Sequence, residues 1–170
     1  MRTLNLVLLA GAAFAALTPA AFAADLLQEP PVAPVVDNSS PMWNGGYIGA
    51  FIQGQTAPSA YGLGGDLGVN ALMNGILIGG ELEAVYETNS QWSAQATGRI
   101  GVGLGDAAIL YAYTGIGTRA TTNTYAPLGG GVEFKIADNL GLKTEAQYNF
   151  DLDNSAENSA AVKVGLNWHF

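Results

Sequence analysis

A chain of 170 residues with 12% charged residues, 23 glycines and a mean hydropathy of +0.21 is unusually apolar. It has no cysteine, which excludes disulfides, thiolate metal sites and a lipidated amino-terminal cysteine, and its net charge of −8 argues against nucleic acid as a partner. Beyond residue 24, no apolar stretch approaches the roughly 20 residues that a membrane helix needs. The chain must therefore cover its apolar surface in another way.

The amino-terminal residues 1–23 have the parts of a secretory signal peptide. Met1 and Arg2 precede the apolar run LNLVLLAGAAFAAL, and the small residues of AFA at 21–23 fit a signal-peptidase site. We expect cleavage after Ala23, so that the mature chain begins Ala24-Asp25 and leaves the cytoplasm. An uncleaved membrane helix is the alternative.

Residues 24–41 are rich in proline and carry three acidic residues. Proline has no N–H to donate to a sheet and favours extended polyproline segments. This composition predicts a linker that precedes a folded domain at residues 42–170.

From residue 43 onward, short runs alternate between apolar and polar residues, which is typical of strands with one buried face. The runs cover 43–54, 62–73, 76–88, 91–104, 107–120, 127–137, 139–151 and 159–170. Asn74-Gly75, Gly105-Asp106 and Asp138-Asn139 suit tight turns. The connections at 55–61, 120–126 and 152–158 are longer, and 88–91 is short. This order predicts an all-β, antiparallel up-and-down sheet with both chain ends on the tight-turn side. A soluble sandwich is the alternative.

The charged residues of the strands share the polar face. We expect the following residues on it: Asp66, Glu81, Glu83, Arg99, Arg119, Glu133, Lys135, Lys143, Glu145 and Lys163. Five acidic and five basic residues favour an enclosed interior, because each buried charge needs a partner there. Arg99 is expected to pair with Glu81, Glu83 or both across neighbouring strands.

Eight strands close into a barrel whose interior is filled by side chains, and closure satisfies every backbone polar group in hydrocarbon. Aromatic residues gather near the predicted strand ends, where interfacial girdles form. They are Trp43, Tyr47, Tyr86, Trp92, Tyr148, Phe150, Trp168 and Phe170. We therefore predict an eight-stranded antiparallel up-and-down transmembrane β-barrel of a bacterial outer membrane, with short periplasmic turns.

The chain ends in AAVKVGLNWHF, with alternate residues from Val162 to Phe170 apolar. This strand is expected to close the barrel against the first one. Trp168 and the terminal Phe170 resemble the signal that the barrel assembly machinery reads.

The segment WNGGYIGAFIQG resembles the Trp-x-Gly-x-Tyr-Ile-Gly opening of small eight-stranded outer-membrane β-barrel proteins of alphaproteobacteria. LIGGELEAVYE, ATGRIGVGL, LYAYTGIGTR and LGGGVEFKIADNLGLKTEAQYNF resemble successive strands of that porin-like, opacity-like and OmpA-transmembrane-like family. The resemblance implies contact with outer-membrane lipid and lipopolysaccharide, and a periplasmic linker and carboxyl terminus. Some relatives are joined to peptidoglycan at an Ala-Asp terminus, which suggests attachment at Ala24 and Asp25.

No catalytic, cofactor or metal site is predicted, and an enzyme is not expected. His169 sits on the tight-turn side, away from the loop serines Ser59, Ser90 and Ser155. The acidic loop residues Asp151, Asp153 and Glu157 suit a solvated loop better than a calcium site. A structural role in the envelope is favoured. The alternatives are a narrow porin-like channel and a surface binding or adhesion barrel, the latter weakened by short outer loops.

Overall fold

A computed structural model describes residues 41–57, 59–89, 91–119, 123–153 and 158–170. The predicted signal peptide 1–23 and linker residues 24–40 lie outside them. The described residues form a short 3-10 helix and eight strands: η1 (Pro41–Trp43), β1 (Gly45–Thr56), β2 (Ser59–Met73), β3 (Ile76–Glu87), β4 (Trp92–Leu104), β5 (Ala108–Arg119), β6 (Asn123–Ala137), β7 (Leu140–Asp151) and β8 (Ser159–His169). Within them, no helix has the length and apolar character needed to cross a membrane.

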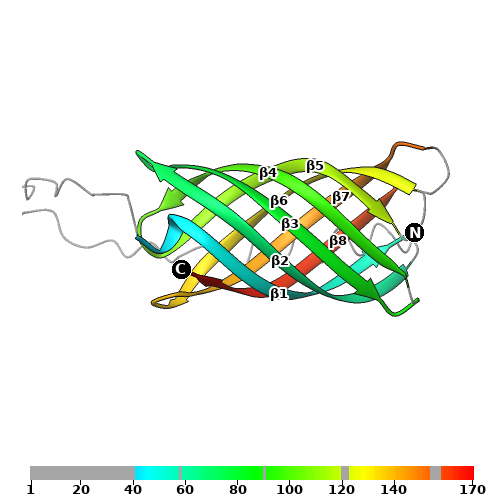
Figure 1. Cartoon of the computed structure of the whole chain (residues 1–170), viewed down its shortest axis with the longest axis horizontal. Helices are drawn as coiled ribbons and strands as arrows, with labels where there is room; N and C mark the ends of the chain where they lie inside the picture. Colours follow the sequence, from blue (N-terminus) through cyan, green and yellow to red (C-terminus); the bar gives the residue numbers. More distant parts are fainter. Residues whose placement is uncertain (1–40, 58, 90, 120–122, 154–157) are drawn as a thin grey trace, which may run out of the picture. The chain divides into compact units, whose positions relative to one another are not determined.

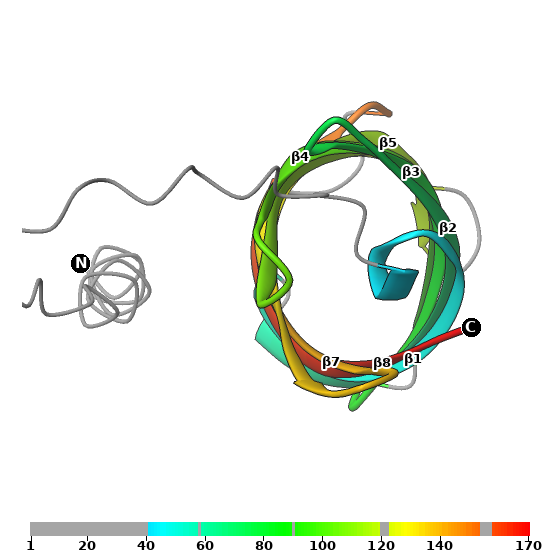
Figure 2. The same cartoon turned by 90° about the vertical axis from the view of Figure 1, so that its left-hand side faces the viewer.

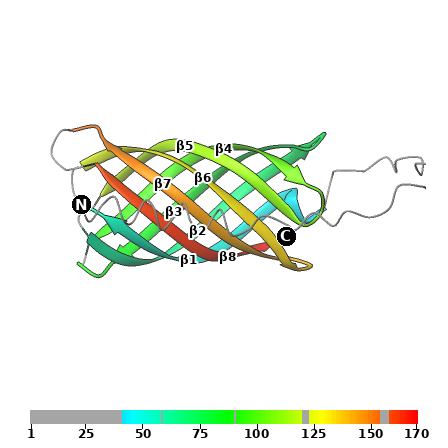
Figure 3. The same cartoon turned by 180° about the vertical axis from the view of Figure 1, so that it is seen from behind.

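The strands form a closed antiparallel barrel. Each strand pairs with its neighbours in the sequence, and β1 also pairs with β8 from Tyr47 opposite His169 to Gln55 opposite Ala161. Figures 1 and 3 show the strands running obliquely around the barrel, and Figure 2 shows the closed ring. Closure leaves no free sheet edge. The predicted eight-stranded up-and-down barrel is confirmed.

One end of the barrel, here called the tight-turn end, carries the short hairpins. Asn74 and Gly75 connect β2 to β3 with φ values of 53° and 79°, the left-handed conformation that a two-residue hairpin turn requires. The β4–β5 and β6–β7 turns, the start of β1 and Phe170 lie at the same end (Figure 1). Backbone hydrogen bonds join neighbours there, including Phe170 N to Gly46 O at 2.9 Å.

At the opposite end, the loop end, two of the four connections are shorter than the sequence predicted, whereas those at 88–91 and 152–158 have the predicted bounds. Thr56 pairs with Ser59, and Arg119 pairs with Asn123. The ladders therefore extend into the regions 55–61 and 120–126 that were expected to be loops, because cross-strand pairing continues once the neighbouring strand is in place.

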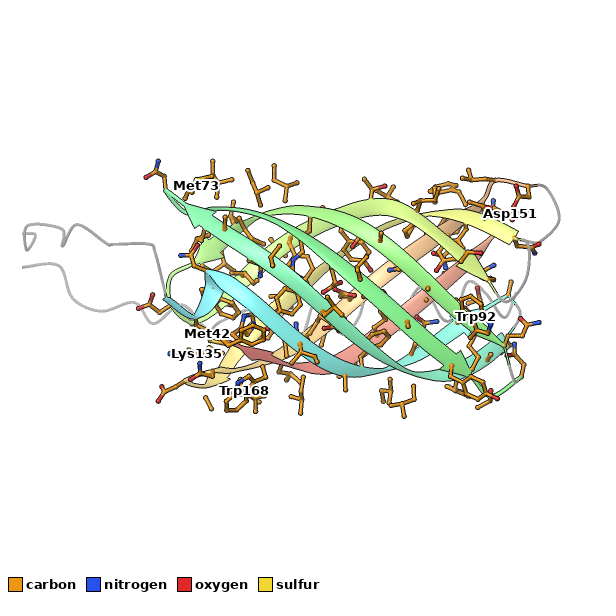
Figure 4. All side chains as sticks on the ribbon, viewed as in Figure 1. Met42, Met73, Trp92, Lys135, Asp151 and Trp168 are labelled. Atoms are coloured by element: carbon orange, nitrogen blue, oxygen red, sulfur yellow. The ribbon has the colours of Figure 1, made fainter. Side chains whose placement is uncertain are left out.

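Side chains alternate between the lumen and the exterior. Along β8, Lys163, Asn167 and His169 are buried, whereas Val164 and Trp168 are exposed. The same alternation puts exposed Ile, Leu and Val on the outside of the other strands. Figure 4 shows both sets, with Met73 and Trp168 pointing away from the barrel. An apolar exterior around a polar interior is the pattern of a lipid-facing barrel.

The predicted aromatic girdles are correct in part. Six of the eight aromatic residues are exposed: Tyr86, Trp92, Tyr148, Phe150, Trp168 and Phe170. Trp43 and Tyr47 are instead buried inside the barrel, with 0% and 1% of their surfaces exposed. Trp43 precedes the first strand in η1 and so does not follow the strand alternation, and Tyr47 has the inward parity of Phe51 and Gln53.

Lys135 does not belong to the lumen, and its predicted inward position is wrong. It lies at the tight-turn rim, where the β6–β7 register shifts between Lys135 and Ala137. Its side chain is exposed, and Nζ lies 3.8 Å from Oδ1 of Asp138 in the adjoining turn. A bulge at a strand end redirects side chains, and water solvates this ammonium group at low cost.

Candidate functional site: the barrel lumen

Lys143 stands at the centre of the lumen. Its fully buried Nζ lies 2.7 Å from Asp66 Oδ2, 3.4 Å from Glu81 Oε2, 3.7 Å from Glu83 Oε1 and 3.8 Å from Glu145 Oε1. Lys143 is on β7, whereas Asp66 is on β2 and Glu81 is on β3, so the ion pairs connect different walls of the barrel. Buried charges are tolerated only when they are paired in this way.

Three of these acidic residues have the spacing of a metal site. Carboxylate oxygens of Asp66, Glu81 and Glu83 lie within 4.8 Å of one another. The ammonium group of Lys143 is in ion-pair distance of all three. The lysine thus occupies the position that a cation would need.

Lys163 provides a second cation beside Lys143. It donates a hydrogen bond to Glu83 Oε2, and its Nζ lies 3.5 Å from Glu145 Oε2. The ring of Phe51 packs against both ammonium groups, with its centroid 5.2 Å from Lys143 Nζ and 5.3 Å from Lys163 Nζ. The face of an aromatic ring attracts cations, so Phe51 stabilises the lysines without adding another formal charge.

Arg99 is held between two tyrosine rings. Its guanidinium carbon lies 4.5 Å from the ring centroid of Tyr47 and 4.8 Å from that of Tyr111. Its Nη1 lies 3.4 Å from Glu81 Oε2, which is the pairing expected from neighbouring strands, and its Nε donates to Asn70 at 2.9 Å. Planar stacking together with hydrogen bonding suits arginine and would not suit lysine.

Tyrosine hydroxyl groups complete the hydrogen bonding of the acids. Tyr47 donates to Glu81 Oε2 at 2.6 Å, and Tyr111 donates to Glu145 Oε1 at 2.8 Å. Tyr113 bonds to Glu145 and to Gln147 Oε1, at 3.4 and 3.0 Å. Sequence reasoning missed these lumen aromatics, although their positions alternate with outward apolar residues and could have indicated their direction.

His169 and Glu133 form a separate buried pair at the tight-turn end. Their Nε2 and Oε1 atoms lie 2.6 Å apart, and Asn167 Nδ2 donates to Glu133 Oε2 at 3.1 Å. The histidine ring also packs against Trp43 and Tyr47. This pair joins the end of β8 to β6, the strand on the other side of β7.

Of the residues considered for catalysis or calcium binding, the structure describes His169, Ser59, Asp151 and Asp153. Ser59 begins β2 at the loop end, opposite His169, while Ser90 and Ser155 lie outside the described residues. Asp153 accepts a hydrogen bond from Thr124 N at 2.5 Å, and Glu157 is also outside the described residues.

Amide side chains fill the lumen toward the loop end. Gln95 and Gln147 exchange two hydrogen bonds of 3.1 Å, and Gln147 donates to Asn149 at 2.5 Å. Arg119 is half-buried here, where it donates to Ser159 Oγ at 2.5 Å and lies over Tyr125 at 4.9 Å. A small recess of about 10 Å³ lies among these side chains.

The lumen is more acidic than the five-to-five balance expected from the sequence. Lys135 is outside, and Glu87 is buried near the loop end, where Gln55 Nε2 donates to it at 3.0 Å. Glu87 has the same strand parity as Glu81 and Glu83, so the alternation alone could have placed it inside.

Several solved structures resemble this barrel. A de novo designed transmembrane β-barrel superposes with a TM-score of 0.59 at 13% identity, covering 75% of this chain and 96% of the designed chain. The fold is that of a small transmembrane β-barrel. The N-terminal β-barrel domain of Pseudomonas aeruginosa OprF gives 0.54 at 18% identity, covering 74% and 98%. The outer membrane enzyme PagL gives 0.55 at 12% identity, covering 73% and 99%.

No family model matches the chain, and no curated protein matches it either. At identities of 12–18%, the solved structures establish the fold alone. They include a designed protein and an enzyme, so the fold does not assign an activity.

Proposed function

We propose that the chain is a structural barrel of the bacterial outer membrane whose filled lumen does not conduct solutes and carries no enzymatic activity. The observation that carries this proposal is the buried ion network around Lys143. Its partners come from β2, β3 and β7, and the Lys143 and Asp66 side chains are both 0% exposed.

A solute that crossed the barrel would have to separate these buried pairs. Removing one partner of such a pair typically costs about 3–5 kcal/mol, because the remaining charge stays buried without compensation. Wide channels arise in barrels with many more strands, whereas eight strands leave an interior that side chains fill. The geometry therefore favours a structural role over the narrow-channel alternative.

The exterior supports a membrane location. Exposed apolar residues cover the strands, with Trp92 near the loop end and Trp168 near the tight-turn end (Figure 4). Lipid tails and the lipid head groups, including lipopolysaccharide, are the partners that such a surface fits. The known outer membrane location of PagL, a barrel of this fold, is consistent with the proposal.

The proposed orientation places the tight-turn end in the periplasm. The signal peptide expected at 1–23 directs export, and the terminal Phe170 is the proposed signal for the barrel assembly machinery. In this orientation, linker residues 24–41 face the cell wall, and Ala24 and Asp25 are the proposed site of peptidoglycan attachment. The resemblance to small outer-membrane barrels of alphaproteobacteria supports this assignment.

Two measurements test the proposed function together. The purified protein should show faster gel mobility before boiling than after, and it should fractionate with the outer membrane. In planar lipid bilayers, it should give no discrete conductance steps. Regular steps from the folded protein would instead support the narrow channel, and a soluble, heat-insensitive protein would contradict the membrane assignment.

Removal of Phe170 tests the proposed recognition by the barrel assembly machinery. Deleting Phe170 should leave unassembled chain in the periplasm, whereas Phe170→Tyr should assemble normally.

Digestion of the cell wall tests the proposed attachment to peptidoglycan. Muramidase treatment of purified cell wall should release a muropeptide joined to Ala24. Complete release of unmodified protein by hot detergent alone would rule out the covalent attachment.

A further inference from the structure

The segment Pro41–Asn44 enters the barrel instead of passing along its outside. Figure 2 looks onto the tight-turn end and shows the turn of residues 41–43 within the ring of strands. Met42 is 6% exposed and Trp43 is 0% exposed. Both belong to an apolar cluster of the lumen whose other members are Leu72, Leu77, Ile109, Tyr111 and Tyr113.

We propose that Met42 and Trp43 form a hinged plug, which closes the tight-turn end of the lumen to water and can leave it without unfolding the barrel. This plug is a conformational element within the chain. It goes beyond the proposed structural function, because it concerns access to one end of the lumen.

The plug is held mainly by apolar contact. Asn44 Oδ1 accepts a hydrogen bond of 2.6 Å from Leu72 N, and the Trp43 ring meets the His169 ring edge-on with centroids 5.3 Å apart. The buried Trp43 Nε1 has no acceptor among the described residues. A buried N–H group without an acceptor reduces the stability of the closed position, since water would satisfy it.

Gly45 provides the hinge between plug and strand. It has a φ of +115°, and a Cβ atom at this position would lie 2.7 Å from the carbonyl oxygen of Phe170. Only glycine suits that combination of backbone angle and close approach. The β1–β2 ladder begins at Gly45 opposite Asn70, so the residues before it are outside the ladder.

Withdrawal of the plug would open one end only. The His169–Glu133 pair and the apolar cluster would meet water, while the ion network around Lys143 would still separate them from the amide side chains at the loop end. An unplugged barrel therefore remains nonconducting under the proposed function. Different experimental results would therefore contradict the plug proposal and the proposed structural function.

Cysteine labelling tests the plug directly, because the natural chain contains no cysteine. Leu77 is fully buried in the plug cluster, so Leu77→Cys places a thiol behind the plug. A small charged, membrane-impermeant thiol reagent should modify it slowly in the otherwise native protein. Combining it with Met42→Ala and Trp43→Ala should raise the rate by roughly tenfold or more, because the protecting segment is gone.

Matched controls distinguish a change in folding from a change in the access of the reagent to Leu77→Cys. Trp43→Phe retains an apolar ring and should leave the labelling of Leu77→Cys slow. Asp106→Cys, exposed in the β4–β5 turn, should react equally fast with or without the plug. All variants are compared only after unboiled gel mobility shows a folded barrel. Equal labelling of Leu77→Cys with and without the plug, whether fast or slow, would overturn the proposal.

A second measurement covers the case in which Leu77→Cys does not fold. The chain has three tryptophans, so Trp92→Phe with Trp168→Phe leaves Trp43 as the fluorophore. Iodide should quench this fluorescence weakly when the plug is closed. Quenching as strong as that of free tryptophan, in a folded barrel, would show that Trp43 is not in the lumen.

Discussion

The two ends of the lumen are closed by different chemistry. At the tight-turn end, Met42 and Trp43 pack on Leu72, Leu77 and Ile109. At the loop end, the amides of Gln95, Gln147 and Asn149 bond to one another around a small recess. Between them lies the ion network of Lys143. Apolar packing excludes water, whereas amides can exchange their partners for water with little change in free energy.

From this difference we expect water to enter the loop end more readily than the tight-turn end. The charges around Lys143 lie between the two ends, where they depend on one another for compensation. Substitutions in the three regions should therefore differ in their effect on stability, with the largest effect in the ion network.

Lys143→Met should have the largest effect on stability. It leaves the carboxylates of Asp66, Glu81, Glu83 and Glu145 with reduced compensation, and the free energy of unfolding should fall by about 3–5 kcal/mol. Denaturant titration in detergent micelles, followed by gel mobility, would measure it. Lys135→Met is the control, since Lys135 is exposed at the rim, and its midpoint should match the native protein. Equal effects of the two substitutions would contradict the central role of Lys143.

Leu77→Ala and Gln147→Ala compare the two ends. Leu77 is fully buried in apolar surroundings, so its truncation should cost about 2–5 kcal/mol. Gln147 lies beside the recess, where water can replace its hydrogen bonds, so its truncation should cost about 1 kcal/mol. The same titration measures both. A Gln147 effect as large as the Leu77 effect would mean that the loop end is as dry as the tight-turn end.

Arg99 and Glu81 should contribute to stability as a coupled pair. The paired variant Arg99→Ala with Glu81→Gln should be more stable than the sum of the single effects predicts, with a coupling of about 1–3 kcal/mol. Glu87→Gln serves as the control partner, because Glu87 lies near the loop end and bonds to Gln55. Additive effects for Arg99 and Glu81 would mean that their ion pair contributes nothing to folding.

The strand alternation predicted the direction of most lumen charges. Side chains alternate strictly along a strand, so the faces of Glu81, Glu83 and Lys143 follow from their parity alone. The pairing partners could not be predicted in this way. Lys143 meets Asp66, 77 residues earlier in the chain, because barrel closure brings β7 across from β2.

Two other positions required the three-dimensional structure. Lys135 has the parity of Glu133, yet its side chain is exposed at the rim beside a register shift. The local sequence pattern does not predict this shift. Trp43 resembled an interfacial aromatic at a strand end, but the 3-10 helix and Gly45 turn the chain into the lumen before the alternation begins. Both departures occur at strand ends, where the ladder no longer fixes the direction of side chains.

Arg119→Gln should have the smallest effect of the lumen substitutions. Arg119 is half-buried at the loop end, bonded to Ser159 and stacked near Tyr125, and part of its charge is screened by solvent. A screened charge of this kind typically contributes under about 1 kcal/mol. Denaturant titration at low and high salt should show little change, and Arg119→Lys should behave like Arg119→Gln. If Arg119→Gln were instead as destabilising as Lys143→Met, the loop end would exclude water as fully as the centre does, and the contrast between the two ends would be lost.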